Sequence, residues 1–560
     1  RLDALTGKRA RRVGLSATIG DLNKASAWMN PEHPETVSIV ESASDAPELR
    51  LQIRAYSDPV DADDTDGLEV DGKPIALDYI ADHIFRNLRG SNNLVFAGSR
   101  RRVEAMADRL RTRSEKADVP NEFFPHHGSL SKELREELEG RLKKADLPTT
   151  GVATTTLELG IDIGSVASVA QIGAPRSIAS LRQRLGRSGR RRGVPAVLRI
   201  YVRERNLGLD ADPLDRLRLE GGRAVASVRL LVEKFVEPPV AETAIATVVL
   251  HQTLSLITQL GGSRADRLYA MICGTGPLSA FTKSDYAGLL RAMASPHLAL
   301  LEQAPDGTIM LGEQGERLTS GRDFYAIFAT DQEWTLVAGG HTLGTIPISN
   351  PVGVGGIVSF AGQRWKITAV DDLAKVLEVA RHASGKIPKF DSLANEPVHD
   401  RLAATMKSVL LSGDAPPYLD AQAAEYLFSA RETFQQLGLE EANLLPAGRH
   451  THVLTWTGSE MNSVLAFALS AAGLDCEALD IGVTVLDTAP ETVAGLLAQI
   501  ADDPPPIEDI AEFVESLRTE KFDELVPEPM LRRLWVNARR SEARALPDLA
   551  RRLMMAWRGA

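Results

Sequence analysis

The sequence predicts an α/β protein of several domains, because the hydrophobic period changes along the chain. Between residues 75 and 205, short β-branched strands alternate with amphipathic helices, which is typical of a doubly wound parallel sheet. Helical patterns dominate from residue 213, the period falls to two between residues 324 and 382, and helical patterns return after residue 391. We therefore expect a parallel α/β domain, a helical unit, a small β module and a helical C-terminal region.

The composition indicates an ordinary globular protein. With 560 residues, 44% hydrophobic and 25% charged, the chain is long enough for three or four domains. No apolar run reaches the ~18 residues that cross a bilayer, and no leader pattern opens the chain, so we expect a cytoplasmic protein without a membrane partner. Cys273 and Cys476 have no CxxC or His partner at ligand spacing, so we expect buried thiols and no metal site.

The net charge of −11 hides a basic segment. Ten arginines and one acid, Glu204, lie between Arg176 and Arg205. The overall negative charge argues against a surface that is coated by nucleic acid everywhere. A local basic groove on an acidic body suits a protein that holds phosphates and then releases them.

The basic segment belongs to the most informative stretch, Gly151–Arg192. Two strand patterns, the second over Val166–Ile172, lead into a predicted helix that carries Gln183, Arg187 and Arg190. Spacings of four and three put these three side chains on one helical face, where they can grip the γ-phosphate of a nucleotide. A solvated basic helix is the commoner meaning of an arginine cluster. Two glycines argue against it, because each costs up to ~1 kcal/mol relative to Ala in a helix.

This stretch resembles two helicase motifs. TTTLELGID, from Thr154, is similar to motif V of superfamily 2 helicases, and QRLGRSGR, from Gln183, is similar to motif VI. LELGIDIG followed by QIGAP resembles the large helicase-related (Lhr) family. The resemblance implies that Arg187 and Arg190 are catalytic arginine fingers supported by Gln183. It also implies that Gly160 and Asp162 bind the nucleotide and that Thr154 and Thr155 bind the nucleic-acid backbone.

Ser16-Ala17-Thr18 resembles motif III, whose residues couple nucleotide state to nucleic-acid grip. On its own the tripeptide is weak evidence, since a pair of strand-end hydroxyls is more often a turn or an N-cap. We expect a short buried strand within residues 11–20 and a helix from about Asp21 to Met29.

Two further segments lie at predicted strand ends. Ser99 and Arg100 resemble motif IV, where a hydroxyl and an arginine sit on one nucleic-acid strand. His126-His127-Gly128 could suggest a metal site, but no third ligand lies at a matching spacing. The resemblance implies instead that His127 and Gly128 contact phosphate at a helix N-terminus.

After residue 212, helical patterns over residues 241–260 and 264–272, and from residue 283, precede a hairpin signal at Pro305-Asp306-Gly307. Three helices and a hairpin indicate a winged helix. By resemblance, this unit is the clamp that such helicases close over the translocated strand.

The β module resembles the additional module of the Lhr core in the strings FYAIF, HTLGTIP and FAGQRWKI. Trp365 lies between two cations and can stack on an unpaired base. Packing within a β-barrel is an equal alternative, because alternation places Trp365 on the face opposite the cations.

Neither GxxxxGK[ST] nor DExH occurs in the chain. The resemblance then implies that most of the first RecA-like domain lies upstream of Arg1, that ATP and Mg²⁺ are mostly bound there, and that this chain alone does not hydrolyse ATP. The expected domains are a remnant of the first RecA-like domain (1–45), a second RecA-like domain (46–212), a winged helix (213–323) and an Lhr-type C-terminal domain (324–560), divided into a β-barrel-like part (324–390) and a helical part (391–560).

We therefore expect the C-terminal portion of an ATP-dependent helicase that moves 3′→5′. Its expected partners are single-stranded DNA or RNA and a DNA or RNA:DNA duplex. Two alternatives stay open: a motor remnant that binds nucleic acid without catalysis, and one half of a split enzyme whose N-terminal half is a separate polypeptide.

Overall fold

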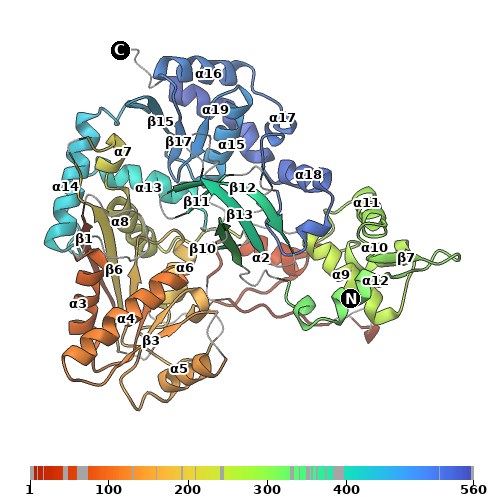
Figure 1. The fold of residues 1–560 in the computed structure, drawn as a ribbon, viewed down its shortest axis with the longest axis horizontal. Helices are drawn as coiled ribbons and strands as arrows, with labels where there is room; N and C mark the ends of the chain where they lie inside the picture. Colours follow the sequence, from red (N-terminus) through yellow and green to blue (C-terminus); the bar gives the residue numbers. More distant parts are fainter. Residues whose placement is uncertain are drawn as a thin grey trace.

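The structure is a computed structural model. It describes the chain apart from residues 1–5, 9, 17, 42–47, 60–73, 129–131, 159–160, 191–192, 209, 240–244, 328–332, 340, 348–353, 355–356, 361–362, 373–374, 382–395, 516 and 556–560. Four parts are distinguished below: the parallel lobe (residues 48–232), the helix–hairpin part (245–327), the β module (333–381) and the C-terminal region (396–555). Figure 1 shows the β module between the other three.

The parallel lobe contains a six-stranded sheet in the order β1-β6-β5-β2-β4-β3, and all of its pairs are parallel. The predicted parallel α/β fold is confirmed. Its strands are β1 (Leu49–Asp58), β2 (Asn93–Phe96), β3 (Phe123–His126), β4 (Thr150–Ala153), β5 (Ser168–Ile172) and β6 (Ala196–Arg205). Its helices are α3 (Ala76–Leu88), α4 (Arg100–Lys116), α5 (Lys132–Lys144), α6 (Ile178–Leu185), α7 (Pro213–Arg216) and α8 (Leu219–Val232), with a 3₁₀ turn η2 (Thr155–Leu157).

Both faces of this sheet are covered, which explains its apolar strands. Val95 and Val152 point into a core with α3 and α4, while Leu94, Phe96 and Ala153 belong to a second core on the opposite face. Neighbouring residues of one strand therefore enter different cores, so the strands read as continuous apolar runs.

The helix–hairpin part has the element order that the sequence predicted. It comprises α9 (Ile245–Leu260), α10 (Ala265–Ile272), α11 (Lys283–Met293), β7 (Leu301–Gln303), β8 (Ile309–Leu311), α12 (Glu313–Ser320) and η3 (Arg322–Tyr325). The hairpin turns at Gly307, whose φ is +84°, and the Asp306 carboxylate accepts the Thr308 amide at 2.9 Å. This is the turn that Pro-Asp-Gly favours.

The period of two predicted a small curved sheet or a barrel for the β module, and the described strand pairs form an open sheet. Its five strands lie in the order β10-β9-β13-β12-β11, so β10 and β11 are the two edges. They are β9 (Glu333–Ala338), β10 (His341–Pro347), β11 (Ile357–Phe360), β12 (Gln363–Asp371) and β13 (Val376–Arg381).

The C-terminal region is not purely helical. A four-stranded antiparallel sheet in the order β14-β15-β17-β16 lies among its helices. Strands of three to five residues are too short for a period to show in the sequence. The elements are α13 (Asp400–Leu411), α14 (Ala421–Gln436), β14 (Leu444–Ala447), β15 (His450–Leu454), α15 (Ser459–Ala471), β16 (Cys476–Ala478), β17 (Gly482–Val485), α16 (Pro490–Asp502), α17 (Ile507–Ala511), η5 (Asp523–Leu525), α18 (Glu528–Ala538) and α19 (Arg540–Met555).

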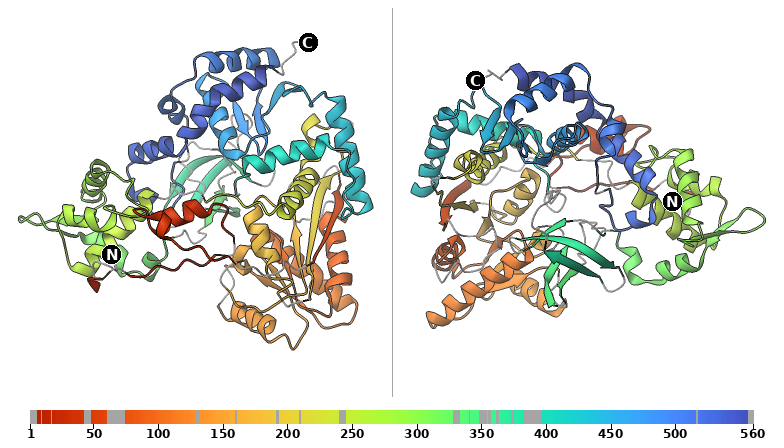
Figure 2. Two further views of the ribbon diagram at one scale, coloured as in Figure 1. Left: turned by 180° about the vertical axis from the view of Figure 1, so that it is seen from behind. Right: turned by 45° about the horizontal axis from the view of Figure 1, so that its top comes forward.

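The predicted buried strand near residue 13 is wrong. Residues 10–16 form no regular element, and Val13 and Leu15 are 71% and 94% exposed. A strand needs a neighbour to pair with, and no described strand pairs with this segment. The expected helix is present as α2 (Leu22–Met29), capped by Asp21, and is followed by η1 (Pro34–Thr36). In Figures 1 and 2 this N-terminal segment runs between the helix–hairpin part and the parallel lobe.

The C-terminal region packs against two other parts. Side chains of α13 and α14 share one core with the parallel sheet and α8, and residues 522–531 share another with α9 and α11. Residues 418–420 also cover the edge of β1, since the Ile53 amide donates to Tyr418 O (2.8 Å) and the Asp420 amide to Ile53 O (2.9 Å). In the described part of the chain, no helix is long and apolar enough to span a bilayer.

Candidate nucleotide and nucleic-acid site

The topology brings three predicted segments to one rim of the parallel sheet. β2, β4 and β3 are neighbours and parallel, so the residues after them emerge at the same edge. The Ala97 amide donates to Ala153 O (3.0 Å) and the Thr154 amide to His126 O (3.2 Å), which holds these strand ends together. Ser99, His127 and Thr154 thus belong to one rim.

Ser99 begins α4. Its hydroxyl accepts the Arg102 amide at 3.2 Å, the geometry of an N-cap. The position of Ser99 at a helix N-terminus is compatible with phosphate binding, because free amides and the helix dipole attract anions there. The side chain of Arg100 lies outside the described residues.

The two histidines differ in role. His126, the last residue of β3, is buried and joins η2 to α5, with Nδ1 2.8 Å from Thr156 Oγ1 and Nε2 3.1 Å from Glu139. Burial lowers the pKa of His126, although Glu139 acts in the opposite direction. His127 is also buried, whereas Gly128 is exposed at the rim. Among the described residues no group of three or more His, Cys, Asp or Glu side chains could hold a metal ion.

The threonines after β4 lie at different depths. Thr154 is half-buried, with its hydroxyl 3.4 Å from that of Thr156, while Thr155 is exposed and opens η2. Thr155 is therefore the more accessible of the two to a nucleic-acid backbone.

The predicted helix that carries three motif VI residues ends earlier than expected. α6 stops at Leu185, with Gly186 as its C-cap, so Gln183 is helical but Arg187 and Arg190 lie in the following turn. A helix could not continue through Gly189 in any case, because its φ is +69° and a Cβ there would lie 2.8 Å from the Ala196 side chain. The prediction of one shared helical face was therefore wrong.

Arg187 is turned toward its own domain. The side chain is 7% exposed. Its Nη1 donates to Ile161 O and its Nη2 to Glu158 O, both at 2.7 Å. Burial lowers the pKa of Arg187, and the nearby Arg190 acts in the same direction. The guanidinium of Arg187, which the resemblance implies to be an arginine finger, is therefore bound to backbone carbonyls of its own domain in this structure.

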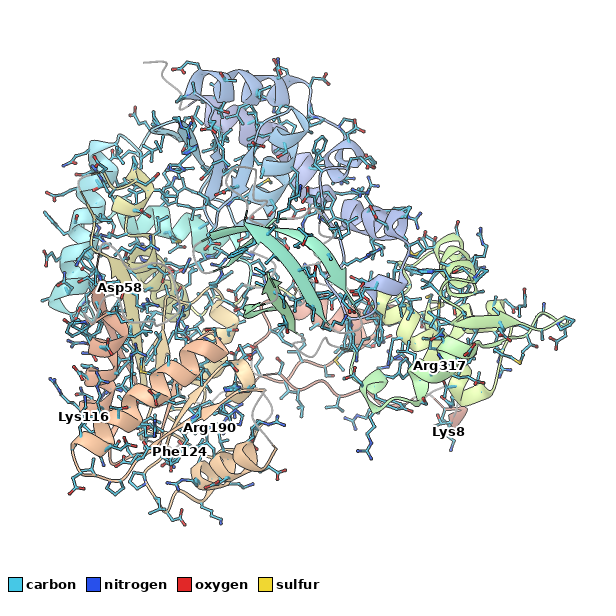
Figure 3. All side chains as sticks on the ribbon, in the orientation of Figure 1. Lys8, Asp58, Lys116, Phe124, Arg190 and Arg317 are labelled. Carbon is cyan, nitrogen blue, oxygen red and sulfur yellow. The ribbon has the colours of Figure 1, made fainter. Side chains whose placement is uncertain are left out.

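Arg190, labelled in Figure 3, is exposed, and its charge acts on the predicted nucleotide-binding acid, Asp162. Its guanidinium donates to Gly186 O (2.8 Å) and Gly164 O (3.3 Å). Asp162 is also exposed and forms an ion pair with Lys143 of α5 at 2.8 Å. The hydrogen bond from Lys143 lowers the pKa of Asp162. Lys143 was not predicted, because nothing in the sequence of α5 links it to the loop before β5.

The motif III and motif VI segments meet. Gln183 Nε2 donates to Thr18 Oγ1 at 2.8 Å, across 165 positions of sequence. The Thr18 amide in turn donates to Ser16 Oγ at 3.2 Å. Ala17 and Gly160 lie outside the described residues.

A buried ion pair that was not predicted from the sequence lies behind this site. Glu158 and Arg184 are both buried. Arg184 Nε donates to Glu158 Oε2 at 2.9 Å, and Arg184 Nη2 lies 2.8 Å from the same oxygen. Arg184 also donates to Gln171 and lies over the Phe96 ring, 5.0 Å from its centroid. Alternation of Glu158 with apolar neighbours was the available signal. The pair anchors α6 to the loop after β4.

Trp365 is half-buried and packs against the core of the β module, formed by residues such as Leu336 and Ile367. Lys366, next to it, is exposed. This arrangement favours the packing alternative over base stacking.

The residues present fit one side of a nucleotide. Arg190 offers an exposed guanidinium, and Asp162 an exposed carboxylate, as polyphosphate and sugar hydroxyls require. They do not form a complete phosphate cradle.

Comparisons agree with this geometry. Residues 75–192 match the helicase conserved C-terminal domain. The ATP-dependent helicase Lhr-Core of Methanothermobacter thermautotrophicus is 30% identical over 223 residues, 40% of this chain and 25% of that protein. The Lhr helicase/uracil glycosylase of Escherichia coli is 33% identical over 228 residues, 34% of this chain and 14% of that protein. The structure of Mycobacterium smegmatis helicase Lhr bound to ssDNA and AMP-PNP matches with a TM-score of 0.58 at 19% identity, over 99% of this chain and 71% of that one.

The parallel lobe with its motif V and VI segments defines a superfamily 2 helicase domain. Within that class, the chain is most like helicases of the Lhr family over the matched segments. The matched segments span only 14–25% of the length of these two curated relatives.

Proposed function

We propose that this chain forms the second motor domain and the accessory domains of an ATP-dependent helicase that translocates 3′→5′ on single-stranded DNA or RNA. The observation that carries the proposal is the Gln183–Thr18 hydrogen bond, which joins the motif III segment to the motif VI segment. Exposed Arg190 lies on the same segment as Gln183. Both curated relatives described above are named as helicases, which supports this reading.

The two arginines take different parts in the proposal. Arg190 is accessible as it stands and would neutralise charge on the transferred phosphoryl group. Arg187 would first have to leave the carbonyl oxygens of Glu158 and Ile161. We propose that it holds the motif V loop in the open state and becomes a finger when a nucleotide-bearing lobe closes.

Nucleic acid would bind along the rim of the parallel sheet. The proposed contacts are made by Ser99, Arg100, His127, Gly128, Thr154 and Thr155. The helix–hairpin part, read as a winged helix, would clamp the strand. In the same proposal, residues 1–45 belong to a first RecA-like domain that holds ATP and Mg²⁺, and Asp162 and Gly160 contact the nucleotide from this side.

The test uses a longer protein in which a first motor domain precedes this chain, as the proposal requires. Arg190→Ala and Arg187→Ala should each lower ATP hydrolysis by a factor on the order of 10³, with single-strand affinity unchanged within a few-fold. Arg111→Ala, on the exposed face of α4, is the matched control and should change neither. If either arginine variant lost single-strand binding but kept ATP hydrolysis, that arginine would be a nucleic-acid contact and not an arginine finger.

A non-catalytic binding protein is the second candidate, and the burial of Arg187 favours it. Such a protein would bind a single strand with salt-dependent affinity that ATP analogues leave unchanged, even with the first motor domain present. A split enzyme would instead regain hydrolysis when the two halves are mixed.

A further inference from the structure

Residues 233–237, here called the strap, connect α8 of the parallel lobe to the segment that leads into α9. The strap also makes specific contacts along its length. Three other segments hold it, and one of them is the helix that carries Gln183.

The strongest contact is made by Glu237 at the first turn of α6. Its two carboxylate oxygens accept the Ile178 amide (2.5 Å) and the Ala179 amide (2.8 Å). Free amides and the helix dipole make this end of α6 attractive to an anion, and Glu237 fills it from outside the helix. Arg182 of α6 also donates to Lys234 O at 3.1 Å. The strap therefore follows α6 along its length.

The motif III segment touches the strap from a second side. A Cβ on Gly20 would lie 2.3 Å from Val236 O and 2.4 Å from Glu237 O. Only a glycine allows the backbone after Thr18 to approach so closely. Thr18 and Gly20 thus contact, respectively, Gln183 of α6 and the strap that caps α6.

The C-terminal region holds the third side. Arg401 forms an ion pair with Glu233 (3.0 Å) and lies over the Phe235 ring, 5.0 Å from its centroid. The His399 ring lies 5.4 Å from the same ring. The strap is thereby fixed on α13 at its start and on α6 at its end.

We propose that Glu237 is a positioning residue that ties α6 to the chain leading into the helix–hairpin part. A nucleic-acid strand bound by the helix–hairpin part would then set the position of Gln183 and Arg190 through this link. This inference rests on the proposed function. It predicts that loss of the Glu237 carboxylate uncouples hydrolysis from strand binding, and that hydrolysis without a strand persists.

In the longer protein, Glu237→Ala should reduce the stimulation of ATP hydrolysis by oligo(dT) about tenfold, through kcat and with little change in KM. Hydrolysis without oligo(dT) should stay within about twofold. Gly20→Ala displaces the strap from the other side, so it should reproduce the effect, and the double variant should be no worse than either single one. Glu491→Ala, which removes an exposed first-turn acid of α16, is the matched control. Additive effects, or equal loss with and without oligo(dT), would overturn the proposal.

Hydrogen exchange on the 560-residue chain keeps the inference separate from the proposed function. Oligo(dT) should change the exchange of the α6 first-turn amides in the wild type and in Glu491→Ala, and leave it unchanged in Glu237→Ala. This result can be obtained even if the longer protein does not hydrolyse ATP. If oligo(dT) changes α6 exchange equally in Glu237→Ala and in the wild type, Glu237 is not a coupling residue.

Discussion

At the scale of single residues, the site depends on charges that have lost contact with water. Glu158 and Arg184 are both buried, and their attraction offsets a desolvation cost that either charge alone could not offset. The buried charge of Arg187 is likewise compensated, in its case by hydrogen bonds to two backbone carbonyl oxygens. Such groups are fixed in position by their partners, which is what a phosphate-binding site requires of its supports.

Removal of one partner should therefore be costly. We expect Glu158→Ala to lower the free energy of unfolding by about 3 kcal/mol, because Arg184 would stay buried without its carboxylate. Asp108→Ala, which breaks an exposed pair with Arg111 on α4, should cost less than about 1 kcal/mol. Urea unfolding followed by circular dichroism measures both. Equal effects would show that the buried pair contributes no more than a surface pair.

A second buried acid predicts a dependence on pH. Burial raises the pKa of Glu204 from 4.5 to about 7, although the Gly221 amide donates to it. The folded chain therefore binds more protons than the unfolded chain between these values, so stability from this group falls as pH rises from 4.5 to about 7. Glu204→Gln should remove this loss and stabilise the protein by up to about 3 kcal/mol near pH 8, and by much less near pH 5. Urea unfolding of both proteins at the two pH values measures the difference, and a constant difference would contradict the assignment.

At the scale of elements, α6 shows what the sequence could and could not predict. Glycines marked a special backbone, and the structure places Gly189 at a φ of +69°. Periodicity alone, however, predicted a helix that continues through Arg190. A periodic pattern contains no information about the close approach of the Gly189 backbone to Ala196 of β6. The rim of the parallel sheet was predictable, since parallel strands bring their carboxyl ends together. The Gln183–Thr18 and Asp162–Lys143 contacts were not, because they join segments that no local pattern relates.

The turn after α6 can be tested with a matched pair of glycines. Gly189→Ala adds the strain of an alanine in the left-handed region. The new Cβ would also lie 2.8 Å from the Ala196 side chain and 2.9 Å from the Ala196 backbone. Gly193 has a similar φ of +79° with nothing within 4 Å of the added Cβ. Gly193→Ala should cost about 1 kcal/mol from strain alone, and Gly189→Ala at least about 2 kcal/mol, by thermal unfolding. Equal costs would mean that the contact with Ala196 relaxes freely.

At the scale of the whole molecule, the C-terminal region braces the parallel lobe. Arg176 and Arg223 of the lobe both pair with Asp480, and His452 Nε2 lies 3.0 Å from Asp212 beside α7. A shared apolar core lies beneath these contacts and runs from the sheet through α8 to α13. The parallel lobe and α13 should therefore unfold as one cooperative unit, separate from the core within the C-terminal region that contains α16.

That cooperativity predicts an effect at a distance. Leu402 of α13 and Leu497 of α16 are both fully buried, but Leu402 belongs to the core shared with the parallel sheet and Leu497 to a core within the C-terminal region. Each substitution by Ala should cost about 2–5 kcal/mol locally. Leu402→Ala should also accelerate hydrogen exchange of the β5 and β6 amides, because the sheet loses a packing partner, whereas Leu497→Ala should leave those amides near their wild-type rates. If β5 and β6 respond equally to both variants, the lobe and α13 do not form a separate cooperative unit, and the arginine-bearing segment is supported by its own sheet alone.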